Sequence, residues 1–428
     1  MSGWYPPAGR RASGAAARQF RRQGLARRTR RAYKSLDIRR ANPPGEGSPV
    51  PAAGRHFNGR NRDMKVIAQT AALQEALTLT GSIVATRTPK PVLQCVKLVA
   101  ANGVLTLMAT DLEAGCRYHV TAVQVEEEGE ALVPADRLNG IVRESDEQSL
   151  TIETEKETCH IRGAGSHFKI FGYDPAEYPA VADFEGAGDF EIPAATLAAM
   201  IGKTLFATSK THSHYAISGV LWEASGKKLQ MVATDGHRLA QAKGATKKSA
   251  AREISAIVPA KLMSLVQRIA TGAEEVLDVK VQENQILIRT ARAVLVSSLV
   301  QGNFPKYTDV IPKESNRKAT IETGRFEHRL RQAALLTNEE SKGVRLSFAA
   351  SQVTLTSRAP ETGEAEVTCP VALDGEPIEI AFNPTFLVDA MRVVDSAEVT
   401  LEMNASNKPA VLRAGSDFLY VLMPVDLG

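Results

Sequence analysis

The strongest constraint on this chain is a pattern that occurs three times. A proline that follows a short apolar stretch and precedes a helical one stands at Pro134, Pro259 and Pro384, with 125 residues between successive copies. Proline suits the first turn of a helix, where its missing N–H would have no partner. Self-similarity at a fixed period means that the chain folds as tandem units rather than around one large core.

Two further markers have nearly the same period. A strand that ends in a Thr-Asp pair occurs at Thr110-Asp111 and, 124 residues later, at Thr234-Asp235; we place its third copy at Thr356-Ser357, after 122 residues. An arginine in the last hairpin of each unit recurs with spacings of 127 and 124, at Arg162, Arg289 and Arg413. The sequence therefore predicts three domains, over residues 64–185, 186–312 and 313–428.

Within each unit, the hydrophobic pattern alternates between strand and helix periods. An opening strand leads to an amphipathic helix, several strands follow, and the proline-started helix precedes the closing strands. We expect the first helices over residues 73–86, 195–209 and 325–337, and the proline-started helices over residues 135–144, 260–271 and 385–394. Two helices against many short antiparallel strands make an α+β architecture.

Residues 1–63 differ from the rest. They hold 14 Arg and one Lys against Asp37, Glu46 and Asp63, a net charge of +12, which leaves −8 for residues 64–428 out of the chain's total of +4. With little apolar surface to bury, this segment is expected to be a disordered Arg-rich extension. A basic arm that contacts nucleic acid, a transit-like segment, and an artefact of a start codon placed upstream of Met64 remain open.

The composition argues against several classes of protein. There is no run of about 18 apolar residues that could cross a membrane, and no apolar segment typical of a secretory signal. His212 and His214 form an H-x-H pair without an evident carboxylate or cysteine partner. The cysteines show no disulfide or metal spacing and are expected to be free thiols: Cys95, Cys116, Cys159 and Cys369. We expect a cytoplasmic protein with neither a cofactor nor a bound metal.

The stretch from Thr234 to Leu239 is the one most open to a catalytic interpretation. Asp235, His237 and Arg238 could act as acid, base and anion clamp, and a metal-dependent hydrolase or nuclease would use Asp235 and His237 together with Asp111. However, Asp-Gly is a strong turn signal. Asp111 and Asp235 are also equivalent positions of different repeats, so they belong to separate domains.

Several stretches carry a resemblance to a known family. They are residues 215–223, 232–240, 304–307, 338–346 and 420–425. In this order, and on a threefold repeat, they resemble the bacterial DNA polymerase III beta subunits, the DNA sliding clamps, over residues 64–428. The resemblance implies three tandem DNA-clamp domains, each with two helices packed on antiparallel sheets, and a ring-shaped head-to-tail homodimer around duplex DNA. It also implies a non-catalytic processivity factor of the nucleoid.

The resemblance further implies a hydrophobic pocket between the second and third domains. It would dock short linear motifs of the DNA polymerase III alpha subunit, the clamp loader, and other polymerases and repair proteins. The matching positions are Ile217, Thr234, Gly236, His237, Arg238, Leu239, Pro305, Val310, Asn383, Phe386, Val421, Leu422, Met423, Pro424 and Val425. Asp309 stands where some members have a basic residue, and Asp426, Leu427 and Gly428 follow the pocket residues, so the motif preference is left open.

The implied ring would place basic residues toward DNA phosphates, which they would contact without reading bases. The DNA-facing positions are Arg87, Arg137, Arg143, Lys203, Lys210, Tyr215, Lys261 and Arg268, joined by Arg325, Arg329, Arg331 and Arg392 in the third domain. In the dimer, Phe168 and Ile170 of one chain would meet Leu335 and Leu336 of the other. A chromosomal binding protein that uses the basic extension is a further interpretation, from another class.

Overall fold

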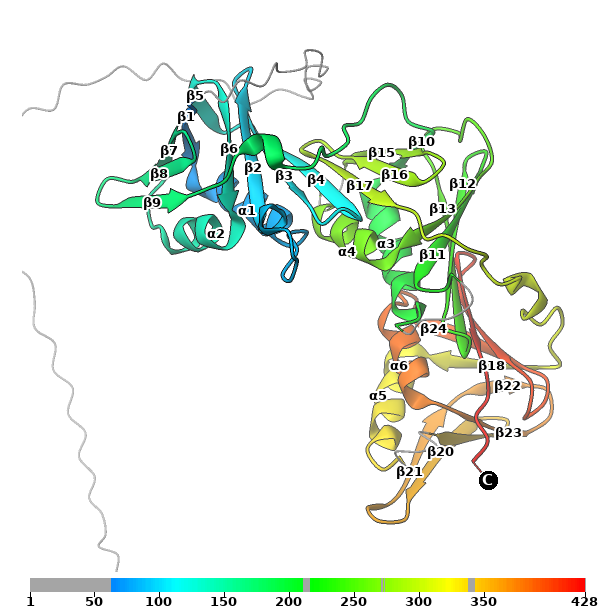
Figure 1. Ribbon diagram of the computed structural model, residues 1–428. Coiled ribbons are helices and arrows are strands. Elements are labelled where there is room, and N and C mark those ends of the chain that lie inside the picture. The colour runs from blue at the N-terminus through cyan, green and yellow to red at the C-terminus, as the bar shows by residue number, and fades with distance from the viewer. Residues whose placement is uncertain (1–62, 211–215, 271, 273, 338–342, 428) are drawn as a thin grey trace, which may run out of the picture. The chain divides into compact units, whose positions relative to one another are not determined.

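The computed structural model describes residues 63–210, 216–270, 272, 274–337 and 343–427 (Figure 1). Apart from Asp63, whose carboxylate accepts the backbone N–H of Lys156 at 2.9 Å, the expected N-terminal extension lies outside the described residues. No helix in these ranges is long and apolar enough to cross a membrane.

The first unit opens with strand β1 (Lys65–Gln69), which runs directly into helix α1 (Thr70–Gly81). A short 3-10 turn, η1 (Pro91–Gln94), follows. Five strands come next: β2 (Cys95–Ala101), β3 (Val104–Thr110), β4 (Ala114–Val120), β5 (Val123–Glu127) and β6 (Gly129–Pro134). Helix α2 (Ala135–Glu144) precedes the closing strands β7 (Ser149–Glu155), β8 (Thr158–Arg162) and β9 (His167–Phe171).

The second unit repeats this order. After the turn η2 (Pro175–Glu177) come β10 (Phe190–Pro193), helix α3 (Ala194–Thr204) and the 3-10 turn η3 (Leu205–Ala207). The next strands are β11 (Gly219–Ser225), β12 (Lys228–Thr234), β13 (Arg238–Ala245) and β14 (Ile254–Pro259). Helix α4 (Ala260–Ile269) leads to β15 (Val276–Val281), β16 (Gln285–Arg289) and β17 (Ala293–Ser298).

The third unit follows the turn η4 (Tyr307–Asp309). It begins with β18 (Arg317–Glu322) and helix α5 (Thr323–Ala334). Five strands come next: β19 (Val344–Phe348), β20 (Gln352–Ala359), β21 (Gly363–Pro370), β22 (Ala372–Asp374) and β23 (Ile378–Phe382). Helix α6 (Pro384–Arg392) precedes β24 (Glu398–Met403), β25 (Ala410–Ala414) and β26 (Phe418–Leu422).

All six predicted helices exist, but only α2 has the predicted bounds; the other five end earlier. Helix α1 stops at Gly81 because Ser82 caps it, with its backbone N–H and its hydroxyl both bonded to the carbonyl of Leu79 at 3.1 and 2.6 Å. The apolar pattern misled the prediction because it continues into buried loop residues such as Ile83, which is fully buried.

The structure also corrects one repeat marker. Strands β3, β12 and β20 begin at Val104, Lys228 and Gln352. Counted from these starts, the third-unit equivalent of Thr234 is Arg358 rather than Thr356. A slip of two residues keeps the alternation of buried and exposed positions along a strand, so hydrophobic periodicity cannot detect it.

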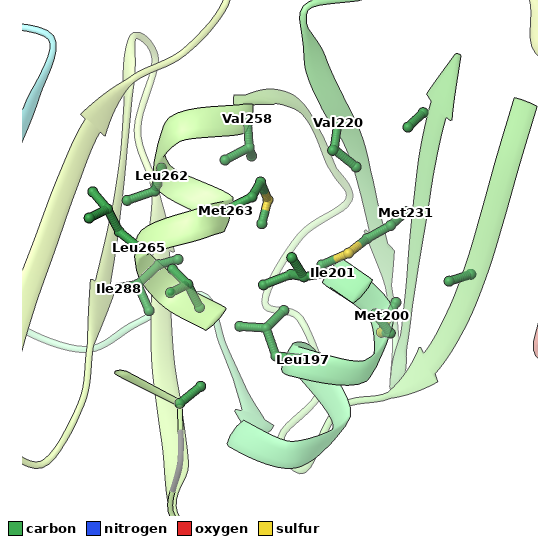
Figure 2. Packing of buried hydrophobic residues seen from close by; sticks show 14 of the residues in the cluster. Leu197, Met200, Ile201, Val220, Met231, Val258, Leu262, Met263, Leu265 and Ile288 are labelled. Carbon is green, nitrogen blue, oxygen red and sulfur yellow. The ribbon is translucent and has the colours of Figure 1, made fainter. Parts of the chain in front are cut away.

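The core of each unit lies between its helix pair and its sheets. Helix α1 packs on α2, α3 on α4, and α5 on α6. Figure 2 shows this core in the second unit, where Leu197 and Ile201 of α3 approach Met263 of α4, with Val220 and Met231 of the neighbouring strands beside them. All five are almost completely buried. Each such side chain contributes about 1.5–3 kcal/mol to folding.

Two sheets run from one unit into the next. In the sheet with strand order β10-β15-β16-β17-β4-β3-β2-β6, β17 of the second unit pairs with β4 of the first. In the sheet ordered β14-β11-β12-β13-β26-β25-β24-β18-β22, β13 of the second unit pairs with β26 of the third. We call these the first and the second junction. The other two described sheets, β5-β1-β7-β8-β9 and β21-β20-β19-β23, have β9 and β21 as edge strands.

Candidate functional site

A tight turn between β12 and β13 forms the centre of the candidate site. The Asp235 carboxylate accepts the backbone N–H groups of His237 and Arg238, both at 3.0 Å. Thr234 Oγ1 accepts the N–H of Gly236 at 3.1 Å and donates to the carbonyl of Arg238 at 2.7 Å. Gly236 has φ = +90°, a conformation that suits glycine. The polar side chains at the start of this turn therefore hold its backbone.

The Arg238 side chain joins this turn to the third unit. Its Nε donates to Asp235 at 3.0 Å, its Nη1 to the carboxylate of Asp389 on α6 at 2.8 Å, and its Nη2 to the carbonyl of Phe206 at 2.9 Å. The guanidinium carbon lies 4.3 Å from the ring centroid of Phe386 and 5.4 Å from that of Phe206. A planar guanidinium can stack and donate in several directions at once. We call these five residues the Arg238 cluster.

Two groups at this site, Arg238 and the adjacent Tyr420, keep one charge state near neutral pH. Burial opposes the charge on Arg238, but its ion pairs with Asp389 and Asp235 outweigh this effect, so the pKa of the guanidinium lies above its usual value. Burial raises the pKa of the Tyr420 phenol, whose hydroxyl donates to the carbonyl of Phe386 at 3.0 Å. The site is therefore built around a permanent cation and a neutral phenol.

The C-terminal residues run along the same cluster. Met423 donates its backbone N–H to the carbonyl of His237 at 3.0 Å, and Val425 donates to that of Ala381 at 2.9 Å. Leu427 lies over Gly343, where any larger side chain would collide with it. The tail is thereby held in place, and it leaves the Met423 side chain 42% exposed.

A separate apolar cluster backs the turn. Its buried members are Ala216, Leu221, Val232, Leu239, Ile257, Val411, Leu419 and Val421, and four partly buried residues pack on it: Val300, Phe304, Tyr307 and Ile311. The Tyr307 hydroxyl donates to Glu223 at 2.7 Å, and Gln230 donates to both groups, at 2.9 Å to Glu223 and 2.7 Å to Tyr307. This network fixes the connection between the second and third units. A cavity of about 550 Å³ beside it is lined by Glu223, Ile257, Asn303 and Pro305, among others.

The structure divides the predicted pocket residues into two groups. Five are buried and can shape the pocket only from behind: Ile217, Thr234, Leu239, Val421 and Leu422. The others, including Arg238 with 10% of its side chain exposed, are exposed or partly exposed: Gly236, His237, Arg238, Pro305, Val310, Asn383, Phe386, Met423, Pro424 and Val425. Asn383 caps α6 by accepting the N–H of Thr385 at 3.0 Å. The turn, the tail and the start of α6 thus come together, while Pro305 and Val310 lie on the connecting segment.

Sequence reasoning missed three members of this arrangement: Phe206, Asp389 and Tyr420. Phe206 was hidden because the predicted helix ran on to residue 209, whereas α3 ends at Thr204 and a 3-10 turn follows. Asp389 had a usable signal. It lies three residues after Phe386 on α6, and residues at that spacing share one face of a helix.

The predicted DNA-facing residues differ in exposure and in whether an acidic side chain pairs with them. Six are exposed, namely Arg87, Arg137, Arg143, Lys210, Lys261 and Arg268, and of these Arg137 and Arg143 pair with their neighbours Asp136 and Glu144. Lys203, by contrast, is 14% exposed and bonds Asp417 of the third unit at 2.8 Å. Lys261 pairs with Asp111 across the first junction. In the third unit, Arg325, Arg331 and Arg392 are exposed and pair with Glu322 or Glu327, and Arg329 is half-buried. Tyr215 lies outside the described residues.

The predicted dimer residues also differ in exposure. Phe168 on β9 is 42% exposed and Leu335 is 80% exposed, whereas Ile170 is buried and Leu336 is half-buried. By sequence alone, the Leu335-Leu336 pair is typical of a helix core. Helix α5 ends at Ala334, however, and this leaves Leu335 in solvent.

The residues of the hydrolase interpretation do not form a catalytic set. Asp235 is bonded to the turn and to Arg238, whereas Asp111 follows β3 of another sheet and pairs with Lys261 of α4. Within the described ranges, no group of three or more His, Cys, Asp or Glu side chains is placed to hold a metal ion.

Comparison with known proteins gives one consistent answer. Family models of the DNA polymerase III beta subunit match the chain with their N-terminal domain at residues 64–182, their central domain at 191–306 and their C-terminal domain at 308–426. The beta sliding clamp of Chlamydia pneumoniae is 31% identical over 367 residues, which cover 85% of this chain and 99% of that protein. The clamp of Escherichia coli K12 is 30% identical over 367 residues, covering 85% of this chain and 100% of that protein.

Solved structures agree with these relatives. The sliding clamp of Pseudomonas aeruginosa bound to griselimycin has a TM-score of 0.81 at 28% identity, covering 86% of this chain and 100% of that one. The clamp of Bacillus subtilis has a TM-score of 0.82 at 26% identity, with coverages of 86% and 100%. Nothing among these proteins supports a metal-dependent hydrolase. Since three domain models match in order and the relatives align over almost their whole length, the chain belongs to the family of DNA polymerase III beta subunits, the beta sliding clamps.

Proposed function

We propose that two copies of this chain close head to tail around duplex DNA through β9 and β21, and that the surface beside Arg238 docks short linear motifs of the polymerase III alpha subunit, the clamp loader and repair proteins. As a sliding clamp, the protein is a non-catalytic processivity factor that works with DNA and a polymerase as a dimer. The proposal includes domain limits at 64–185, 186–312 and 313–428 and a cytoplasmic, nucleoid-associated location.

One observation carries ring closure: β9 and β21 correspond to the two strands that pair at each junction inside the chain. Strand β9 closes the last hairpin of its unit, as β17 and β26 do, and β21 follows β20 as β4 follows β3 and β13 follows β12. An edge strand is a template for pairing with another chain. A head-to-tail contact of this kind closes into a ring where the rotation allows.

The first junction also supplies a register for β9. There, Val294 of β17 lies opposite Arg117 of β4. Within its own hairpin, Val294 faces the marker Arg289, just as His167 of β9 faces the marker Arg162. His167 therefore takes the place of Val294.

Glu366 of β21 takes the place of Arg117 by the same reasoning. Arg117 lies opposite Met108, the fifth residue of β3, and Glu366 lies opposite Thr356, the fifth residue of β20. His167 of one copy is thus set against Glu366 of a second copy. The next pair on the same face of the antiparallel strands is Lys169 and Glu364.

The second junction gives a template for the apolar part of this contact. Phe206 lies 12 residues after the first residue of α3, and Leu335 lies 12 residues after the first residue of α5. In their hairpins, Tyr420 lies opposite Leu412 and Phe168 lies opposite Ile161. Each of these partners directly precedes the hairpin arginine of its unit. The ring centroids of Phe206 and Tyr420 are 5.6 Å apart. We infer a matching contact between Leu335 of one copy and Phe168 of the other, flanked by Ile170 and Leu336.

Charge reversal tests this register. Lys169→Glu and Glu364→Lys should each weaken the dimer, because each sets like charges against each other across the paired strands. The double variant should recover most of the loss. Sedimentation equilibrium measures the dimer constant, and a double variant as weak as the sum of the two single variants would refute the register.

Topological binding to DNA has a direct test. The clamp is loaded on nicked circular DNA with its loader, and the DNA is then linearised with a restriction enzyme. A ring slides off the free ends, whereas a protein bound in a groove stays on the DNA. Retention on linear DNA in high salt would contradict encirclement.

The pocket proposal rests on exposed apolar side chains beside a rigid polar frame. Met423 is 42% exposed beside the hydrogen-bonded turn, and the tail continues toward the capped start of α6, while Val310 on the connecting segment is 48% exposed. Apolar anchors of a peptide bind such surfaces. Deleting residues 423–428 should abolish binding of the polymerase alpha subunit in a pull-down but leave sliding on DNA intact. Unchanged polymerase binding would refute this assignment.

A further inference from the structure

Two histidines that lie seven residues apart in the sequence meet on the β8–β9 hairpin. His160 Nδ1 and His167 Nε2 are 3.0 Å apart, and the two rings are stacked with centroids 5.3 Å apart and planes 21° from parallel. They are diagonal neighbours across the strand pair, since His160 faces Lys169 and His167 faces Arg162. Neither residue belongs to the proposed pocket or to the DNA-facing set.

We propose that this pair chelates a divalent transition-metal ion that prefers imidazole ligands, such as Zn²⁺ or Ni²⁺. Two nitrogens bound to one tetrahedral ion at about 2.0–2.1 Å lie about 3.3 Å apart. The observed separation is close to this value, so a small rotation of the rings directs both lone pairs to one point. Imidazole is a preferred ligand for zinc, copper and nickel.

Metal binding requires a neutral imidazole, and the surroundings of His167 favour that form. Desolvation, and then the positive charges of Arg162 and His160, lower the pKa of His167; Lys169 acts in the same direction, and Glu153 acts against it. The positive charges of Arg162 and Lys169 weaken the attraction for a dication. Glu153, which faces His160 from β7, partly offsets them. We therefore expect modest affinity at neutral pH and loss of binding in acid.

Within one chain the pair supplies two ligands, and the described side chains include no group of three. In the proposed ring Glu366 of a second copy lies opposite His167, and water would fill the positions that remain. Because the ligands come from neighbouring strands, a bound ion would tie the edge strand β9 to β8. An ion that binds the folded form raises its stability by mass action.

Calorimetric titration of the full chain with Ni²⁺ at neutral pH, in a non-coordinating buffer, tests the site. We expect one ion per chain. His160→Gln and His167→Gln should each weaken binding by at least about tenfold. Each single variant should lose about as much affinity as the variant with both His160→Gln and His167→Gln, because one remaining imidazole cannot chelate. The matched control is the variant with both His212→Gln and His214→Gln, which removes the other closely spaced pair and should bind Ni²⁺ normally.

Three results would overturn the site: unchanged affinity in His160→Gln and His167→Gln, loss of binding in the His212/His214 control, or no binding in the wild type up to about 1 mM ion. Both imidazoles lie on the solvent face of the hairpin, so the variants should fold; thermal unfolding without metal verifies this. Both imidazoles belong to one hairpin of one chain, so failure of the metal site would leave the proposed ring untouched.

Discussion

The two junctions of this chain contain the same turn, yet only the second carries the candidate pocket. At the first junction, Asp111 accepts the N–H groups of Glu113 and Ala114 at 3.0 and 2.7 Å, as Asp235 does for His237 and Arg238 at the second. The third turn residue has a positive φ in both, +80° at Leu112 and +90° at Gly236. The backbone of the two turns is therefore equivalent, hydrogen bond for hydrogen bond.

The difference lies in one side chain. Where the second junction has Arg238, the first has Ala114, whose methyl side chain cannot form a polar contact with the next unit. The second oxygen of Asp111 instead meets Lys261, which is 42% exposed. At the second junction, the Arg238 cluster joins the two units, and the C-terminal tail runs beside it. The same turn backbone thus carries a distinct site at the second junction because of the Arg238 guanidinium and the residues that pack on it.

Arg238→Ala should have the largest effect of any change at either junction. It leaves the carboxylates of Asp235 and Asp389 without their partner in a mostly buried place, which costs about 3 kcal/mol of unfolding free energy. Polymerase binding should be lost as well. Urea denaturation and a binding assay measure the two effects, and Arg268→Ala, at an exposed arginine of α4, serves as the control. Equal stability of the two variants would contradict the role given to the cluster.

Exchanging the residue with positive φ, Gly236 at the second junction and Leu112 at the first, should change stability in opposite directions. Gly236→Ala meets no steric obstacle, since nothing lies within 4 Å of the added carbon, but a side chain at positive φ costs about 1 kcal/mol. Leu112→Gly should relieve a similar strain and be neutral or stabilising. Thermal unfolding compares the pair, and a stabilising Gly236→Ala would show that the turns are not equivalent.

Breaking the ion pair at the first junction should matter less. Lys261→Met should cost about 0.5–1 kcal/mol, because Lys261 is partly solvated, and it should leave polymerase binding unchanged. Urea denaturation gives the first quantity and the pull-down gives the second. A loss as large as that of Arg238→Ala would mean that the first junction depends on this pair as much as the second depends on its arginine.

The smallest expected effect is a pH dependence confined to the first junction. Burial, and then Arg117, lower the pKa of His119 on β4, whereas Asp183 raises it. The folded chain therefore binds fewer protons here than the unfolded chain, and stability falls as pH drops through about 6.5. The equivalent position of β13 is Lys243, so the second junction has no such group. His119→Gln should flatten the pH profile of stability between about pH 7 and pH 5; an unchanged slope would exclude this residue as its source.

The fold followed from the sequence because its signals are local and repeated. The proline-started helix at residues 135–144 was predicted to the residue, since proline at one end and an apolar stripe define it. The candidate site was predicted less completely. The Asp-Gly turn is a clear local signal, but the contact of Arg238 with Asp389 depends on how β13 of the second unit pairs with β26 of the third. In the same way, His160 and His167 meet only through the register of one hairpin.

The edge strands β9 and β21 also affect whether an unassembled chain pairs with the wrong strand of another copy. Two β21 strands placed side by side would bring Glu364 and Glu366 against the same carboxylates of the other copy, and two β9 strands would oppose their lysines. Like charges on adjoining edges discourage such contacts. The mixed pair of β9 with β21 is the combination in which the charges match. The charges on these strands thus favour assembly over aggregation before any DNA is bound.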